Sequence, residues 1–231
     1  MDEASGEPRH ARVRNGLGRA IVSGTYGQGA LLPGDAELME RFGVSRTVLR
    51  EALKALAGKG LIAARARVGT RVCDRAAWNL FDPEVLAWHA DAGVTPAFLK
   101  HLGEMRLAFE PEAAALAAQR RTDQDLAALH TCLEQMAGAD FVAADVAFHL
   151  AVARAADNPF MRTLGALIEV ALASSLTVSS PQSDPQLLAQ SLAAHRAILA
   201  AIDRRDEEAA RTSMRAVIEA GMRRVRGEAS A

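Results

Sequence analysis

Apolar residues recur at helical spacing through the first third of the chain, in short segments separated by turns. Leu17 and Ile21 fall on one face of a segment that predicts a helix. Gly43 divides the next helical pattern in two, as in a tight turn between helices. Two β-like runs follow, one on either side of a basic turn. We therefore expect a three-helix unit and a hairpin, with helices at 11–23, 35–42 and 45–59 and strands at 61–64 and 70–73.

From Pro96 onward, the spacing of apolar positions is helical. Pro111 fits the first turn of a new helix, and Pro159 follows Asn158, a residue that can end the helix before it. The predicted fold is mainly α: an N-terminal winged helix-turn-helix and a C-terminal antiparallel all-α bundle. The helices expected in the bundle lie at about 96–109, 111–120, 123–137, 141–156, 159–178, 185–203 and 206–226.

Between these two parts lies the segment WNLFDPEVLAW, which contains both tryptophans, Trp78 and Trp88. We interpret it as a connector or an anchor between domains. The predicted boundaries are 9–75 for the winged unit, 76–95 for the connector and 96–228 for the helical bundle.

Composition agrees with packed helices in an intracellular protein. Half of the residues are hydrophobic and only 4% are aromatic, and alanine and leucine favour helices over β-sandwiches. No apolar run reaches membrane-spanning length, and the first residues lack the apolar core of a signal peptide. Cys73 and Cys132 form no CxxC motif. We expect a cytoplasmic protein without a membrane partner.

The net charge of −1 hides an uneven distribution of charge. Residues 9–75 hold 13 Lys and Arg against five Asp and Glu, a net charge of +8. Residues 76–231 hold 14 basic and 20 acidic residues, a net charge of −6. A basic N-terminal part on an acidic remainder indicates that the first part meets a polyanion, unless the charges cluster by chance.

The segment 45–59 has the layout of a recognition helix, because one face is apolar and Arg46, Thr47 and Arg50 fall on the other. Arginine can contact guanine through two hydrogen bonds, and threonine can contact a thymine methyl group or a phosphate. On the wing, Arg65, Arg67 and Arg71 could hold the DNA backbone or enter the minor groove. The alternative is an ordinary helical hairpin with exposed arginines. The wing and the local charge favour DNA binding.

These residues also carry a family resemblance. The stretch from LLPGDAELMERFGVSRTVLREAL to the wing sequence ARARVGTRV resembles the winged helix of GntR-type bacterial transcription regulators over about residues 10–74. Many members have an arginine where this chain has Ala36, so one DNA contact is expected to be missing or supplied elsewhere. The resemblance implies operator contacts at Ser45, Arg46, Thr47 and Arg50, with Arg67 and Gly69 at the wing.

Polar groups interrupt the apolar stripes of the predicted bundle. Asp145 and His149 are four residues apart and share a helix face, and His195 and Arg106 lie on apolar stripes of other helices. Buried polar groups need partners. A divalent cation bound by Asp145, His149 and His195 would supply partners for these three, and an effector carboxylate would supply one for Arg106. The alternative is that the histidines are hydrogen-bonded core residues and that Arg106 pairs with a glutamate such as Glu110.

The bundle is similar to the FCD type of effector domain, which is found in the fatty-acid-regulator-like subfamily of GntR proteins. The similar pieces are EMRLAFEPEAAALAA, DVAFHLAVARAADNP and AAHRAILAAIDRRDEEAARTSMRAVI, which cover most of 98–226. The resemblance implies a homodimer whose bundles enclose a metal of the Zn, Ni or Mn class and a small carboxylate. Metal-binding members have a further histidine where this chain has Val217. Either three ligands hold a metal here, or the histidines bind the effector directly.

The connector WNLFDPEVLAW is similar to that of sugar-acid regulators in this subfamily. The expected function is therefore a dimeric repressor that binds an inverted-repeat operator and is released by a sugar acid. One alternative keeps the regulator but makes the ligand another carboxylate or an acyl-CoA. The other is a metal-dependent hydrolase or lyase that uses Asp145, His149 and His195. It lacks a clear additional base and leaves the basic N-terminal part unexplained, so we expect no enzyme.

Overall fold

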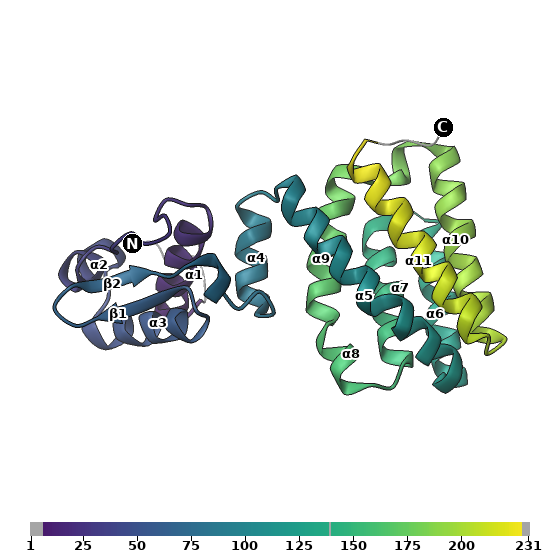
Figure 1. Cartoon of the computed structure of the whole chain (residues 1–231), viewed down its shortest axis with the longest axis horizontal. Coiled ribbons are helices and arrows are strands. Elements are labelled where there is room, and N and C mark those ends of the chain that lie inside the picture. Colours follow the sequence, from purple (N-terminus) through teal and green to yellow (C-terminus); the bar gives the residue numbers. More distant parts are fainter. Residues whose placement is uncertain (1–6, 139, 228–231) are drawn as a thin grey trace. The chain divides into compact units, whose positions relative to one another are not determined.

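The computed structural model describes residues 7–138 and 140–227, with only the backbone for 166 and 177–179 (Figure 1). The chain divides into two compact units, Met1–Gly93 and Val94–Ala231. The first is a winged helix-turn-helix and the second is all-helical, so the predicted fold class is confirmed. The expected end of the bundle at residue 228 lies outside the described residues.

Three helices form the core of the first unit. Leu17, Leu49 and Leu56 are at most 1% exposed, because residues three to four positions apart place the same face of each helix toward its neighbours. Gly43 turns the chain between the second and third helices with a φ of 61°, in the left-handed region that glycine adopts without strain. The helices are α1 (Arg9–Val22), α2 (Asp35–Phe42) and α3 (Arg46–Gly58).

The wing is an antiparallel hairpin of β1 (Ile62–Arg65) and β2 (Gly69–Val72), in which Ile62 pairs with Val72. Leu31 adds an isolated bridge to Arg71 beside it. Ile62 and Val72 are at most 3% exposed, so the base of the hairpin belongs to the core of the first unit, while the tip is exposed.

The predicted connector, 76–95, contains a helix that packs on the winged unit. This helix is α4 (Pro83–Asp91), and its Trp88 is 2% exposed. A Cβ added to Gly18 of α1 would lie 2.6 Å from the Trp88 ring, so only glycine lets α1 approach the indole this closely. Ion pairs add to the contact: Arg14 with Glu84, and Lys59 Nζ with Asp82 Oδ2 (2.6 Å) and Glu84 Oε2 (2.8 Å).

The second unit is a bundle in which α5 and α11 lie side by side (Figure 1). Alanines on α5 allow the close approach, and Ala114, Ala117 and Ala118 are fully buried. Among the described residues, no helix is long and apolar enough to cross a membrane. The bundle contains α5 (Pro96–Arg120), α6 (Asp123–Met136), α7 (Phe141–Ala155), α8 (Pro159–Thr163), α9 (Gly165–Ser179), α10 (Pro185–Asp203) and α11 (Glu207–Val225).

Two helix boundaries were predicted wrongly. The chain does not break at Pro111, which lies inside the continuous helix α5. Proline removes one backbone donor and usually kinks or ends a helix, but here Pro111 is buried among helices that hold α5 in place. The single helix expected at 159–178 is interrupted at Leu164, beside Gly165, into α8 and α9.

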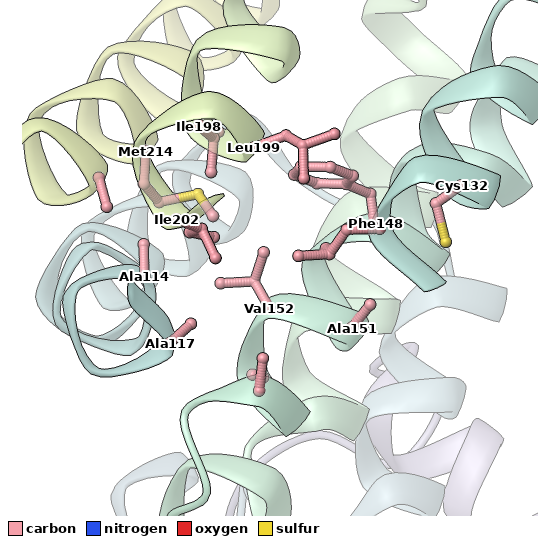
Figure 2. Close-up of a cluster of buried hydrophobic side chains, with 14 of the residues drawn as sticks. Ala114, Ala117, Cys132, Phe148, Ala151, Val152, Ile198, Leu199, Ile202 and Met214 are labelled. Atoms are coloured by element: carbon pink, nitrogen blue, oxygen red, sulfur yellow. The ribbon is translucent and has the colours of Figure 1, made fainter. Parts of the chain in front are cut away.

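The core of the bundle is apolar at one level and polar at the next. Figure 2 shows Phe148 and Val152 of α7 facing Ile198 and Ile202 of α10 and Met214 of α11. These side chains are at most 1% exposed. The polar level contains the residues that are charged or titratable and yet buried: Arg106, Glu110, Asp145, His149 and His195.

Candidate functional site

The N-terminal end of α3 presents the predicted DNA-contacting residues. Arg46, Thr47 and Arg50 are all exposed on the surface of the first unit. Ser45 precedes the helix as its N-cap, and its Oγ accepts a hydrogen bond from the Val48 amide at 3.4 Å. The cap fixes the start of the helix, so that its first turn presents two arginines and a threonine together, as a recognition helix requires.

The tip of the wing carries two further exposed arginines, Arg65 and Arg67. Arg67 has a φ of 63° and Gly69 a φ of 115°, so the turn between the strands uses the left-handed region twice. Arg71 is different, because its Nη1 donates a hydrogen bond to the Gly29 carbonyl at 2.8 Å and holds the neighbouring loop. The wing therefore offers Arg65 and Arg67 as its cationic tip.

Two arginines of the basic part stabilise the first unit. Arg41 Nη1 donates to the Tyr26 hydroxyl at 2.7 Å, and Arg12 Nη2 donates to the Phe42 carbonyl at 3.0 Å. Arg12 and Arg41 therefore have structural roles, although both remain charged and exposed. Ala36 is exposed in the first turn of α2.

In the second unit, α7 and α10 bring together the three predicted metal ligands. Asp145, His149 and His195 are at most 4% exposed, and one ligand atom of each lies within 4.8 Å of the others. Asp145 Oδ1 lies 3.1 Å from His195 Nε2, and Asp145 Oδ2 lies 3.9 Å from His149 Nε2. Two ring nitrogens therefore face one carboxylate.

The Nδ1 atom of each ring contacts an oxygen on the side of the ring that faces away from Asp145. His149 Nδ1 lies 2.5 Å from Glu110 Oε2, and His195 Nδ1 lies 2.8 Å from the Ser191 carbonyl oxygen. Oxygens of this kind accept hydrogen bonds, so in the neutral rings we assign the proton to Nδ1. Neither Nε2 has a hydrogen-bond partner among the described residues, although both are buried. Each Nε2 lone pair then faces the Asp145 carboxylate, at 3.1 Å for His195, and a cation between these groups would relieve this unfavourable contact.

Glu110 is held on its other side by Arg106. Arg106 Nε donates to Oε1 at 2.5 Å and Nη2 donates to Oε2 at 3.3 Å. Burial alone would raise the pKa of Glu110, but Arg106 and His149 outweigh it and lower this pKa to about 2. Burial would likewise raise the pKa of Asp145, and contact with His195 lowers it below its ordinary value. Both carboxyl groups are therefore ionised at neutral pH.

The pairing of Arg106 with Glu110 is the arrangement that the sequence left open as the alternative to an effector contact. Arg106 still lines the cavity beside Asp145 and His149. A guanidinium carries five N–H donors, and two of them serve Glu110. A direct role of Arg106 in effector binding remains a prediction.

The polar groups surround a cavity of about 90 Å³ between α5, α7, α9, α10 and α11. Sequence reasoning missed Arg224, which lines this cavity together with Gln190 and Ser191. Burial lowers the pKa of Arg224, and the charge of Asp145 acts in the opposite direction. The signal was available, because Arg224 follows Val217 by seven residues and so falls on the same face of α11.

The donor set fits a divalent metal of the Zn, Ni or Mn class. Two imidazole nitrogens without hydrogen-bond partners and an ionised carboxylate are ligands that such ions accept. Val217 lines the cavity where a further histidine was expected. Asp145, His149 and His195 would then hold an ion by three protein ligands and leave positions for oxygen atoms of water or a ligand. A metal bound there would supply positive charge for an anionic ligand.

Comparison with known protein families supports both halves of this description. Residues 10–72 match the family described as bacterial regulatory proteins, gntR family. Residues 101–220 match the FCD domain. The two matched segments coincide with the winged helix and the bundle, and the resemblance inferred from the residues is confirmed.

Relatives of similar length are regulators. The chain is 33% identical over 215 residues to the galactonate operon transcriptional repressor of Escherichia coli K12, covering 91% of this chain and 93% of that protein. It is 34% identical over 209 residues to the uncharacterized HTH-type transcriptional regulator YieP of the same organism, covering 87% and 89%. The fold is similar to that of Lar, which controls expression of the Listeria monocytogenes agr system (TM-score 0.66, 18% identity, covering 96% of this chain and 99% of that one).

Proposed function

Because the chain belongs to the GntR family of bacterial regulatory proteins and carries an FCD domain, we propose that it is a transcriptional repressor released from its operator by a sugar acid. It is a transcription regulator and not an enzyme, like the relatives it matches. The hydrolase or lyase alternative is therefore set aside. The ligand, the direction of regulation and the assembly are the parts that we propose.

The proposed operator contacts are those of the exposed end of α3 and the wing tip. Arg46 and Arg50 would read base edges in the major groove. Ser45 and Thr47 would contact phosphate or a thymine methyl group. On the wing, Arg65 and Arg67 would hold the adjacent DNA backbone. Gly69 would allow the wing turn to follow the DNA backbone. A homodimer in the cytoplasm would place two such units on an inverted repeat.

The observation that carries the effector proposal is the polar cavity in the bundle. Arg224 offers a cation for a carboxylate, while Gln190 and Ser191 offer partners for hydroxyl groups. A sugar acid combines one carboxylate with several hydroxyl groups. The similar galactonate operon repressor is named for a system of this chemical class. Galactonate is therefore the first ligand to test.

Charge favours an anion together with a cation in this cavity. The positive charge of Arg106 offsets the negative charge of Glu110, and that of Arg224 offsets the charge of Asp145. An added carboxylate would leave a negative charge in a buried site, which is costly unless it is compensated. We infer that a divalent metal on Asp145, His149 and His195 strengthens binding of the sugar acid.

Release from DNA requires that the ligand bind the two states of the protein with different affinities. At about 90 Å³ the cavity is below the range of about 300–1,000 Å³ that is typical of small-molecule pockets, so a sugar acid enters it only if α7, α10 and α11 move apart. We propose that the liganded packing is incompatible with the spacing of the two winged units on the operator.

A thermal-shift screen of the full chain tests the effector proposal. We expect galactonate or another aldonate to raise the unfolding midpoint, more so with Zn²⁺, Ni²⁺ or Mn²⁺, and neutral galactose to leave it unchanged. A shift produced only by non-sugar carboxylates or by an acyl-CoA would replace the sugar acid with one of those ligands. If none of these compounds shifts the unfolding midpoint, the proposal of an effector site in this cavity is contradicted.

A further inference from the structure

A second, larger cavity lies beside the polar one and is not used by the function proposed above. It has a volume of about 310 Å³ between α5, α9 and α11. This lies within the range of about 300–1,000 Å³ that is typical of small-molecule pockets. Its walls are mainly apolar, formed by Leu99, Leu102, Ala171, Met222 and Val225.

The two cavities share part of one wall. Arg106, Ser175 and Gly221 line both of them. Lys100 and Arg226 add further cationic side chains to the lining of the larger cavity. A pocket with an apolar body and basic groups in its lining is complementary to a molecule with an apolar body and one negative charge.

Neither the backbone conformation nor the space for a Cβ requires glycine at position 221. Its φ is not in the left-handed region, and an added Cβ would meet only Arg224 Nη2 at 3.7 Å, an ordinary contact. Gly103 on the facing helix is different, because a Cβ there would lie 2.7 Å from Met222 Sδ. Glycine weakens a helix interior relative to alanine. At position 221 its effect is to leave space open along the shared wall of the two cavities.

We propose that the larger cavity is a second ligand site, which binds a monocarboxylic acid with an aromatic or short aliphatic body. The small residues Ala97, Gly103, Ala171 and Gly221 leave flat wall segments for a ring. The Met222 thioether offers a favourable sulfur–aromatic contact. The carboxylate lies toward the basic side chains, and Gly221 keeps the passage beside them open. This site does not depend on the identity of the effector in the polar cavity.

Calorimetric titration of the full chain with 4-phenylbutyrate tests the site. We expect one molecule to bind per chain, and the uncharged analogue 4-phenylbutanol to bind at least about tenfold more weakly because it cannot pair with a cation. Equal binding of the acid and the alcohol would contradict the carboxylate class. Absence of binding by the wild-type chain would overturn the proposal.

Variants locate the site. Ala97→Trp fills the larger cavity from an exposed position, and Ala127→Trp places the same side chain on an exposed part of α6 that lines neither cavity. We expect Ala97→Trp to reduce 4-phenylbutyrate affinity by at least about tenfold and Ala127→Trp to leave it unchanged. Equal affinities of the two variants would place the ligand elsewhere. A changed sedimentation coefficient of Ala97→Trp with unchanged ligand affinity would make the cavity a contact between copies and overturn the proposal.

Gly221→Leu distinguishes two roles of this glycine, keeping the passage open and stabilising the fold. We expect it to raise the unfolding midpoint by about 2–4 °C, because leucine is the better helix former, and to abolish binding of 4-phenylbutyrate. A merely structural glycine would give the reverse result, a lower midpoint with ligand binding kept, and that result would contradict the role of Gly221.

Discussion

Glu110 Oε2 lies 2.5 Å from His149 Nδ1, and this contact determines which ring nitrogen of His149 faces the polar cavity. The same carboxylate accepts two hydrogen bonds from Arg106. One buried anion therefore joins a buried cation to a candidate metal ligand.

Glu110→Gln should destabilise the bundle strongly. The amide removes the charge that compensates Arg106, and breaking a buried ion pair in this way typically costs about 3–5 kcal/mol of unfolding free energy. Glu112→Gln is the matched control, because Glu112 pairs with Arg211 and its side chain is 52% exposed. We expect the control to lose less than about 1 kcal/mol. Chemical denaturation measures both, and equal losses would contradict the buried network.

Arg50→Ala should weaken recognition of the operator. Loss of one arginine that contacts a base costs about 1–3 kcal/mol, or roughly 5- to 150-fold in affinity. The control is Arg204→Ala, an exposed arginine of the second unit. Fluorescence anisotropy on an operator selected from random duplexes compares the two variants. If Arg50→Ala binds as tightly as the control, α3 is not the recognition helix.

Arg67→Ala should change the salt dependence of DNA binding. A phosphate contact releases counterions, so removing one contact reduces the slope of log K against log salt by about one. The measurement is a series of operator titrations at several salt concentrations, with the unrelated exposed Arg204→Ala variant as reference. An unchanged slope would mean that the wing tip does not contact the backbone.

Val217→His should strengthen metal binding. Val217 lines the cavity of Asp145, His149 and His195, so a histidine there adds a fourth ligand to a site that has three. We expect Zn²⁺ affinity to rise by about tenfold or more, measured in competition with a chromogenic chelator. Ala216→His adds the same group at an exposed neighbouring position and should have no effect. Equal affinities of the two variants would argue against a metal centre at this place.

The pattern of residues predicted the winged unit well because its signals are local. Gly43, the apolar face of 45–59 and the basic turn of the hairpin lie within one short stretch. The pair Asp145 and His149 was found for the same reason, since a spacing of four residues fixes a shared helix face.

Long-range packing produced the parts that the sequence did not predict. Glu110 and His149 are 39 residues apart, and periodicity alone cannot say which acid a buried histidine meets. Arg224 sits on the same α11 face as Val217, but only the packed bundle shows that this face lines a cavity. Pro111 predicts a helix start because proline is over-represented at the first helical position, and packing around α5 overrides that tendency.

The central claim is that a sugar acid in the polar cavity releases the protein from DNA, and operator titration with and without galactonate tests it most directly. We expect galactonate to weaken operator binding by at least about fivefold, the lower end of typical allosteric coupling. Arg224→Gln should remove this response while operator affinity without ligand stays the same, and its exposed neighbour variant Arg223→Gln should respond as the wild type does. Operator affinity that is unchanged by galactonate and other aldonates, or a full response in Arg224→Gln, would contradict the claim.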